Sequence, residues 1–126
     1  MGLMDEIKRK ARSSVKRVVL PEGTEERTIK AAEIISKEGI AKVILLGNEE
    51  EIRAKAAGLD YSAVDIVDLH KTGKLDDYAA EFYEMRKHKG ITMEQAKTTM
   101  EDPLFYACMM VKKGEADGMV AGAINS

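Results

Sequence analysis

The sequence predicts an α/β fold in which a three-layer arrangement places helices on both faces of a parallel sheet. Short apolar, β-branched runs alternate along the chain with longer amphipathic segments. Such alternation is typical of parallel sheets whose strands are joined by crossover helices. The run at 41–46 is apolar almost throughout, as expected of a strand covered on both faces.

The first half of the chain is expected to contain three strands. Leu3, Ile7 and Ala11 recur every fourth residue, which predicts a short helix ending near Ser13. The predicted strands lie at 17–20, 41–46 and 64–67.

Two helices are expected to connect these strands. Thr24 is the predicted N-cap of the first, and Gly39 stands where a glycine terminates a helix. Its predicted buried stripe consists of Ile29, Ala32 and Ile35. The second helix follows Gly47 and Asn48, and its predicted inner side consists of Ile52, Ala56 and Ala57.

The second half is predicted to be mostly helical. One helix, ended by Gly90, is indicated by the spacing of Leu75, Tyr78, Ala79, Phe82 and Met85. Thr92 and Gln95 predict a capping box for a short helix that carries Met93, Ala96 and Met100. Asp102 and Pro103 begin the next helix, with proline at its first position. Its predicted inner face consists of Leu104, Ala107, Cys108 and Val111, and a last strand is expected at 118–121.

Composition and charge argue against a nucleic-acid-binding, membrane-spanning or secreted protein. A formal net charge of -2 over 126 residues gives no general attraction to nucleic acid or to an anionic membrane. No apolar run approaches the ~20 residues that span a bilayer, and the N-terminus lacks a secretory apolar region. The single cysteine cannot form an internal disulfide, so we expect a cytoplasmic location.

Three loops are expected at the carboxyl ends of the strands, where ligands bind in open parallel sheets. They lie at 21–24, 47–48 and 122–126, and none contains a Gly-x-Gly-x-x-Gly or Walker sequence. In the last loop, Gly122 and Ala123 leave backbone accessible and Ser126 adds a hydroxyl, which together suit a phosphate. A plain turn also explains these small residues, and the pattern alone favours it over a phosphate site.

A basic run at 86–89 closes the helix that ends at Gly90. Lys87, His88 and Lys89 are placed to oppose the negative end of the helix dipole, which favours a structural role. Arg86 differs because it lies four residues after Phe82, at the border of the apolar stripe. A guanidinium there suits recognition of phosphate or carboxylate, and a structural ion pair fits the pattern equally well.

The remaining candidates favour structural roles. His70 has no partner at metal-ligand spacing and is expected to be a solvated loop residue. Cys108 is predicted to be a buried structural thiol rather than a nucleophile. Asp117, before the last strand, is expected to form a turn rather than to act as a base. The methionines expected to pack in the interior are Met109, Met110 and Met119.

Several strings of residues are similar to the N-terminal part of the phosphate acetyltransferases, also called phosphotransacetylases. They include Leu-Pro-Glu-Gly-Thr-Glu-Glu-Arg-Thr at 20–28, Gly-Ile-Ala at 39–41 and Leu-Leu-Gly-Asn at 45–48. The segments at 81–90 and 114–126 resemble the same family, in particular Arg-Lys-His-Lys-Gly and Gly-Ala-Ile-Asn-Ser. The likeness runs almost end to end and is closer to the acetyl enzymes than to the phosphate butyryltransferases.

The resemblance implies reversible transfer of acetyl between coenzyme A and phosphate, with acetyl phosphate as the other substrate. It implies no metal and no cofactor, coenzyme A being a substrate. The fold should resemble that of the isocitrate and isopropylmalate dehydrogenases, whose two α/β domains enclose the active site. By the same resemblance, Arg86 is a coenzyme A contact and Ser126 belongs to a loop that holds the phosphoryl group.

On this resemblance, residues 1–126 form the N-terminal part of the first α/β domain, and the second domain and C-terminal elements are missing. The catalytic residues of the family lie in those parts, so no residue here is assigned as catalytic. We therefore expect the chain alone to be inactive and to form homo-oligomers that cover an exposed sheet edge. The alternative is a non-catalytic binding or assembly module that retains the acetyltransferase scaffold.

Overall fold

The computed structural model describes residues 2–12, 16–58 and 64–121. Four parallel strands and the helices that connect them make up this part of the fold. The first elements are α1 (Leu3–Arg12), β1 (Arg17–Leu20), α2 (Glu26–Lys37), β2 (Lys42–Leu46), α3 (Glu49–Lys55) and β3 (Asp65–Val67). They are followed by α4 (Leu75–Arg86), the 3₁₀ turn η1 (Lys87–Lys89), α5 (Met93–Met100), α6 (Pro103–Lys112) and β4 (Gly118–Met119).

The strands form one sheet in the order β3-β2-β1-β4, and every pair of neighbours is parallel. The predicted α/β class is therefore confirmed. Side chains alternate between the two faces, as the pleat of a strand requires. Val18 and Leu20 of β1 join one apolar cluster, whereas Val19 between them joins the other.

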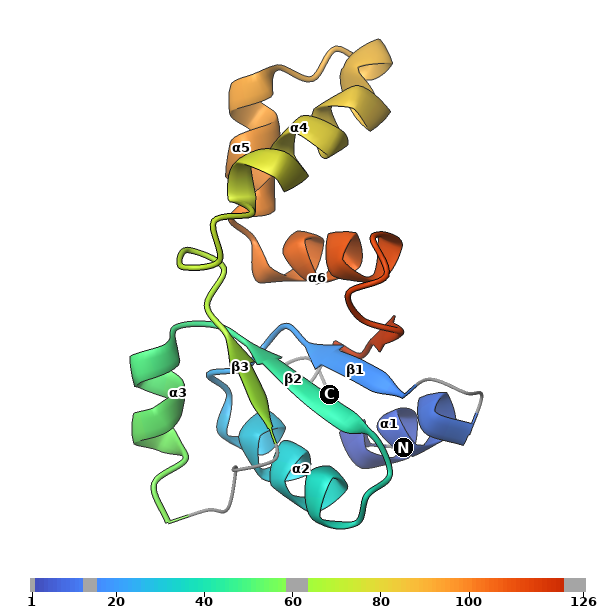
Figure 1. The fold of residues 1–126 in the computed structure, drawn as a ribbon, viewed down its shortest axis with the longest axis vertical. Helices are drawn as coiled ribbons and strands as arrows, with labels where there is room; N and C mark the ends of the chain where they lie inside the picture. The colour runs from blue at the N-terminus through green and yellow to red at the C-terminus, as the bar shows by residue number, and fades with distance from the viewer. Residues whose placement is uncertain (1, 13–15, 59–63, 122–126) are drawn as a thin grey trace.

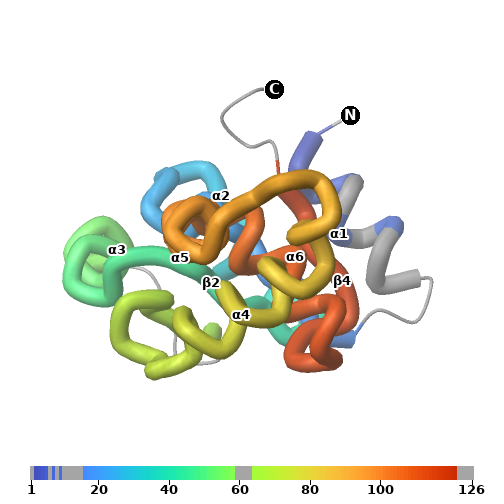
Figure 2. The backbone as a smooth tube through the Cα atoms, turned by 90° about the horizontal axis from the view of Figure 1, so that it is seen from above, coloured from blue at the N-terminus to red at the C-terminus, as the bar shows by residue number. Residues whose placement is uncertain are grey.

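The two clusters define the outer layers. On one face, α1, α2 and α3 bury Ile7, Ile35 and Ile52 against the sheet. On the other face, α6 packs nearest to the strands, and the α4–α5 pair lies farther from them (Figure 1). Viewed from above, α3 and α1 lie at opposite ends of the sheet (Figure 2). Each fully buried aliphatic side chain contributes about 1.5–3 kcal/mol to this packing.

Local sequence signals explain most element boundaries. The strand at 17–20, the capping box of Thr92 and Gln95, and the proline at the start of α6 all occur as predicted. Gly39 follows α2 with a φ of 67°, a left-handed conformation that glycine adopts without strain.

Three local predictions are wrong. Thr24 does not cap α2: the N-cap is Glu25, because Glu25 N–H bonds to the carbonyl of Glu22 and closes a turn before the helix starts. Ala57 is exposed because α3 already ends at Lys55. Cys108 is exposed as well, as discussed below.

The inner face of α6 is rotated relative to the prediction. Tyr106, Ala107, Met109 and Met110 are buried, whereas Leu104 is 42% exposed and Cys108 is exposed. The segment from 104 to 111 is apolar throughout, so its periodicity does not select one face. The predicted packing roles of Met109 and Met110 are confirmed, and Met119 packs against the same cluster.

Candidate functional site

A slot of about 200 Å³ lies between the end of α4 and the outer face of α6. We call it the α4–α6 slot. Helix α4 contributes Phe82, Met85 and Arg86, and α5 contributes Met100. Helix α6 contributes Phe105, Cys108, Met109 and Lys112. The walls are therefore apolar, with a cation from each of the two main helices.

Arg86 is exposed and lies over one aromatic ring at this slot. Its guanidinium carbon lies 5.9 Å from the centre of the Phe82 ring, within the range of a cation–π interaction. The Phe82 ring in turn meets Phe105 edge to face, with 6.2 Å between ring centres. In the part of the chain that the structure describes, no carboxylate forms an ion pair with Arg86. The structural ion pair that the pattern allowed is thus not formed there.

The other residues of the basic run, Lys87, His88 and Lys89, do not line the slot. Lys87 pairs with Glu84 at 2.8 Å, and its carbonyl accepts the N–H of Gly90. His88 and Lys89 are exposed in the 3₁₀ turn. Gly90 has a φ of 87° and ends the turn. Arg86 is the member of this run that lines the slot, because it occupies the last helical position on the apolar side of α4.

A second cation at the slot was not singled out from the sequence. Lys112 is the last residue of α6, and it is exposed. No acidic side chain lines the α4–α6 slot. The lining of the slot thus carries two cations and no acid, whereas Glu81 and Glu84 line an adjoining hollow that shares Met85 and Lys112 with it. Such a slot suits an anion that also carries an apolar group.

Cys108 also lines the slot, and this overturns its predicted burial. The thiol belongs to the outer face of α6, one helical turn before Lys112. Because it is exposed, it is accessible to reagents from solvent.

The loops at the carboxyl ends of the strands form a separate rim. Gly23 N–H donates to the carbonyl of Leu46 at 3.1 Å, and Gly47 N–H donates to that of Val67 at 3.0 Å. The first bond ties the loop at 21–24 to the end of β2, next to the loop at 47–48, and the second ties that loop to the end of β3, as expected for neighbouring parallel strands. The loop at 122–126, including Ser126, lies outside the described residues.

Asp68 anchors this rim and was missed by the sequence argument. Its carboxylate is buried and accepts N–H groups from His70 at 3.0 Å and Glu49 at 3.4 Å. An acid that directly follows a predicted strand is a signal that could have identified it. His70 itself is exposed, in agreement with its predicted loop position.

Arg86 does not belong to the rim. The residues that line its slot all come from α4, α5 and α6. Figure 1 shows that the end of α4 lies well away from the loop between β2 and α3. The structure thus separates two predicted features, the strand-end loops and the arginine.

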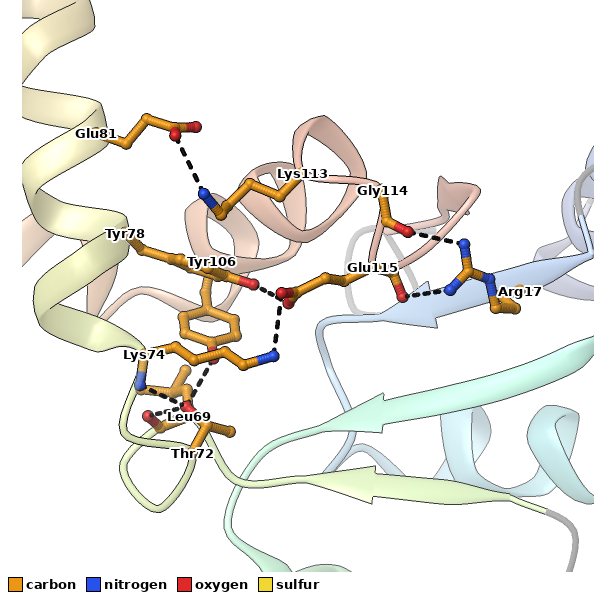
Figure 3. A network of polar contacts seen from close by, with 10 residues as sticks. All are labelled: Arg17, Leu69, Thr72, Lys74, Tyr78, Glu81, Tyr106, Lys113, Gly114 and Glu115. Carbon is orange, nitrogen blue, oxygen red and sulfur yellow. Dashed lines mark hydrogen bonds and ion pairs between the residues drawn. The ribbon is translucent and has the colours of Figure 1, made fainter.

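A polar network fixes the other end of α4 (Figure 3). The hydroxyl of Tyr78 donates to the carboxylate of Glu115, which also accepts from Lys74 at 3.0 Å. Burial raises the pKa of Glu115, but the hydrogen bonds from Tyr78 and Lys74 outweigh it and the net pKa is lowered. Tyr106 shares a hydrogen bond of 2.8 Å with Thr72 below this group. These partners all belong to the fold, so the network is structural.

Arg17 links the same turn to the sheet. Its guanidinium donates to the carbonyls of Gly114 at 2.8 Å and Glu115 at 3.3 Å, and to both carboxylate oxygens of Asp117 at 3.2 Å. The hydrogen bond from Arg17 lowers the pKa of Asp117, which makes this exposed carboxylate a poor general base. Asp117 therefore has a structural role, as predicted. Its carboxylate bonds to Arg17 of β1, however, and not to main-chain groups of the turn in which it lies.

Within residues 2–12, 16–58 and 64–121, no group of three or more His, Cys, Asp or Glu residues could hold a metal ion. None of the helices described is long and apolar enough to cross a membrane.

Comparison with known proteins identifies clear relatives. A family model described as phosphate acetyl/butaryl transferase matches residues 2–126. A phosphate acetyltransferase of Thermoanaerobacterium thermosaccharolyticum is 55% identical over the whole of this chain and 38% of its own length. The phosphate acetyltransferase of Acetivibrio thermocellus is 56% identical over the same shares. The chain thus spans 38% of the length of these curated relatives.

Solved structures agree with these matches. A phosphotransacetylase from Streptococcus pyogenes superposes with a TM-score of 0.81 and 34% identity, covering 98% of this chain and 38% of the other. The EutD phosphotransacetylase from Staphylococcus aureus has a TM-score of 0.79 and 28% identity, covering 98% and 39%.

Proposed function

Because the chain belongs to the phosphate acetyl/butaryl transferase family, we propose that it supplies part of an enzyme that transfers acetyl between coenzyme A and phosphate. The preference for acetyl over butyryl is supported by the two relatives named phosphate acetyltransferase, which are 55% and 56% identical. The residues described here lie in the N-terminal part of the first domain of that enzyme.

We assign to Arg86 the role of holding coenzyme A. The observation that carries this assignment is an arginine without an acidic partner among the described residues, placed at the mouth of an apolar slot. Arginine presents paired donors that match a phosphate, and bonds of this kind are about twice as strong as neutral hydrogen bonds. Ser126, which lies outside the described residues, is proposed to contact the phosphoryl group on the strength of the resemblance.

In the reaction, the thiolate of coenzyme A attacks the carbonyl carbon of acetyl phosphate. The new carbon–sulfur bond forms, the carbon–oxygen bond to phosphate breaks, and phosphate leaves with the electron pair. Positioning the thiol carrier is the contribution that we propose for this chain. We assign no catalytic residue, and we propose that the 126-residue chain alone does not turn over substrate.

Calorimetric titration with coenzyme A tests the role of Arg86. Loss of a charge-assisted bond of about 1.5–3 kcal/mol predicts that Arg86→Ala weakens binding by roughly 10- to 150-fold. Lys89→Ala is the matched control, since it removes the same charge from the same basic run but does not line the slot. Equal losses in both variants would mean that only general attraction acts, and absence of binding by the unsubstituted chain would refute the assignment.

A non-catalytic assembly module is the second candidate. It is favoured by large apolar side chains that stay exposed, among them Leu104 and Phe105 at 42% each. Such side chains are common at protein interfaces. Sedimentation velocity separates the two candidates: concentration-dependent self-association without coenzyme A binding would support assembly.

A further inference from the structure

Lys112 differs from its neighbours at the contact between α4 and α6, because its ammonium has no acidic partner among the described residues. Lys113 pairs with Glu81 at 3.1 Å, and Lys87 pairs with Glu84 at 2.8 Å. Lys112 is exposed at the last position of α6, and in the part of the chain that the structure describes no ion pair or hydrogen bond holds its side chain. Its amine is therefore free to react.

An acidic partner lowers the reactivity of a lysine towards acyl groups. Only the neutral amine carries the lone pair that attacks a carbonyl carbon, and a carboxylate beside the ammonium favours the protonated form. The hydrogen bond to Glu84 raises the pKa of Lys87 in this way. Lys113 has the same kind of partner in Glu81. The described residues offer Lys112 no such stabilisation of its charged form.

Lys112 also lies where two hollows meet. It lines the α4–α6 slot, and it lines the adjoining hollow that contains Glu81 and Glu84. Both of these acids are already paired with the lysines named above. Arg86 is the second cation of the slot, and no acid lines the slot itself. Cations without a matching acid attract small anions and raise their concentration nearby. An acyl donor that carries phosphate is thus drawn towards the free amine.

We propose that Lys112 is acetylated by the acetyl donors of the reaction, acetyl phosphate and acetyl-coenzyme A. This inference rests on the proposed function, which supplies the donors. The nitrogen of neutral Lys112 attacks the acetyl carbonyl carbon and forms an amide, while the carbon–oxygen or carbon–sulfur bond of the donor breaks. Phosphate or the coenzyme A thiolate leaves with the electron pair, and the proton of the amine passes to solvent. The amide is uncharged, so the slot loses one of its two cations.

Mass spectrometry of the chain after incubation with acetyl phosphate tests the proposal. Cleavage after glutamate is not blocked by acetylated lysine, and it places Lys112 and Lys113 in the peptide 102–115 and Lys97 in the peptide 95–101. Fragmentation of the first peptide separates its two lysines. Lys97 is the matched control for position, since it is exposed on α5, has no acidic partner among the described residues and does not line the slot. Lys113 is the control for pairing with an acid.

Lys112 should react about tenfold faster than Lys97 at low salt, and this ratio should fall as salt screens the two cations of the slot. Lys113 should react more slowly than Lys112, because Glu81 holds it protonated. Glu81→Gln should bring the rates of Lys112 and Lys113 closer together. Equal rates at Lys112 and Lys97 at low salt would overturn the proposal, and so would a rate at Lys113 that matches that of Lys112 in the unsubstituted chain.

A second incubation, with acetyl-coenzyme A at the same concentration, distinguishes the two sources of the acetyl group. Preferential acetylation of Lys112 by either donor supports the proposal and identifies that donor, and preference by neither overturns it. If calorimetry shows that coenzyme A binds while neither donor prefers Lys112 over Lys97, this inference fails and the proposed function stands. If coenzyme A does not bind while acetyl phosphate still prefers Lys112, the reactive amine is confirmed and the proposed role in holding coenzyme A fails.

Discussion

Gly23→Ala should destabilise the fold through a single close contact at the strand-end rim. A Cβ at this position would lie 2.6 Å from the carbonyl oxygen of Leu46 and 3.0 Å from its carbonyl carbon and nitrogen. All three neighbours are main-chain atoms, so no side chain can rotate away. Either the loop at 21–24 or the end of β2 must move.

The magnitude follows from two costs. Forcing extra volume into a packed site costs about 1–3 kcal/mol. The movement also breaks the hydrogen bond from Gly23 N–H to Leu46, now 3.1 Å, whose net contribution is about 0.5–1.5 kcal/mol. The expected loss is therefore about 2–4 kcal/mol, a large share of the roughly 5–15 kcal/mol that stabilises a typical domain.

Urea unfolding followed by circular dichroism measures this loss. With a slope of about 1–2 kcal/mol per molar urea, the midpoint should fall by at least about 1 M. Gly2→Ala is the control for the added methyl group, because a Cβ there meets no atom within 4 Å. Its effect should stay within about 0.5 kcal/mol. If Gly23→Ala is no more destabilising than Gly2→Ala, the close approach of the two main chains does not exist in solution.

Two further substitutions test the polar contacts of the last turn. Glu115→Gln should reduce the loss of stability in acid. The pKa of Glu115 in the folded protein lies below 4.5, so the stability that its carboxylate contributes is present above that pH and is lost as the pH falls through the folded pKa. Urea unfolding between about pH 5 and pH 2 measures this loss. An unchanged slope against pH would contradict it. Arg17→Met should release Asp117 and speed amide exchange at Val120, whose N–H donates to Val19 at 3.1 Å, while exchange in β2 serves as the unaffected reference.

Local chemistry explains which parts of the fold were predictable from the sequence. The strand at 17–20 is a short β-branched run closed by Pro21, and the capping box of Thr92 and Gln95 depends only on residues three apart. Glycine at a left-handed position marks the end of α2 at Gly39. Each of these signals is complete within a few residues, so distant parts of the chain cannot change it.

Tertiary contacts explain the failures. Helix α6 is apolar on every side, so which face is buried depends on where the sheet and α4 lie. Cys108 therefore faces outward although its spacing matched an inner stripe. The bonds from Arg17 to Asp117 join residues 100 apart, and no spacing rule predicts such a pair.

Only the part of the candidate site that lies on α4 was predictable from the sequence. The position of Arg86, four residues after Phe82, indicated the border of an apolar stripe, and the structure places it there. The opposite wall of the slot comes from α6, and only the packing of α6 beneath α4 reveals Phe105 and Lys112 as its members.

The Glu115 network and the slot each include a residue of the same helix, α4. Tyr78, which bonds to Glu115, precedes Arg86 by eight residues on the same helix, about 12 Å at 1.5 Å per residue. A tilt of roughly 10° about the Tyr78 end would therefore move Arg86 by about 2 Å, more than a charge-assisted hydrogen bond tolerates. Protonation of Glu115 in acid can thus weaken ligand binding without any titration in the slot. Coenzyme A binding can therefore be measured at falling pH in the unsubstituted chain and in Glu115→Gln. If binding is lost in acid only when Glu115 is present, the group that takes up the proton is Glu115, at the first turn of α4, and not a residue that contacts the ligand.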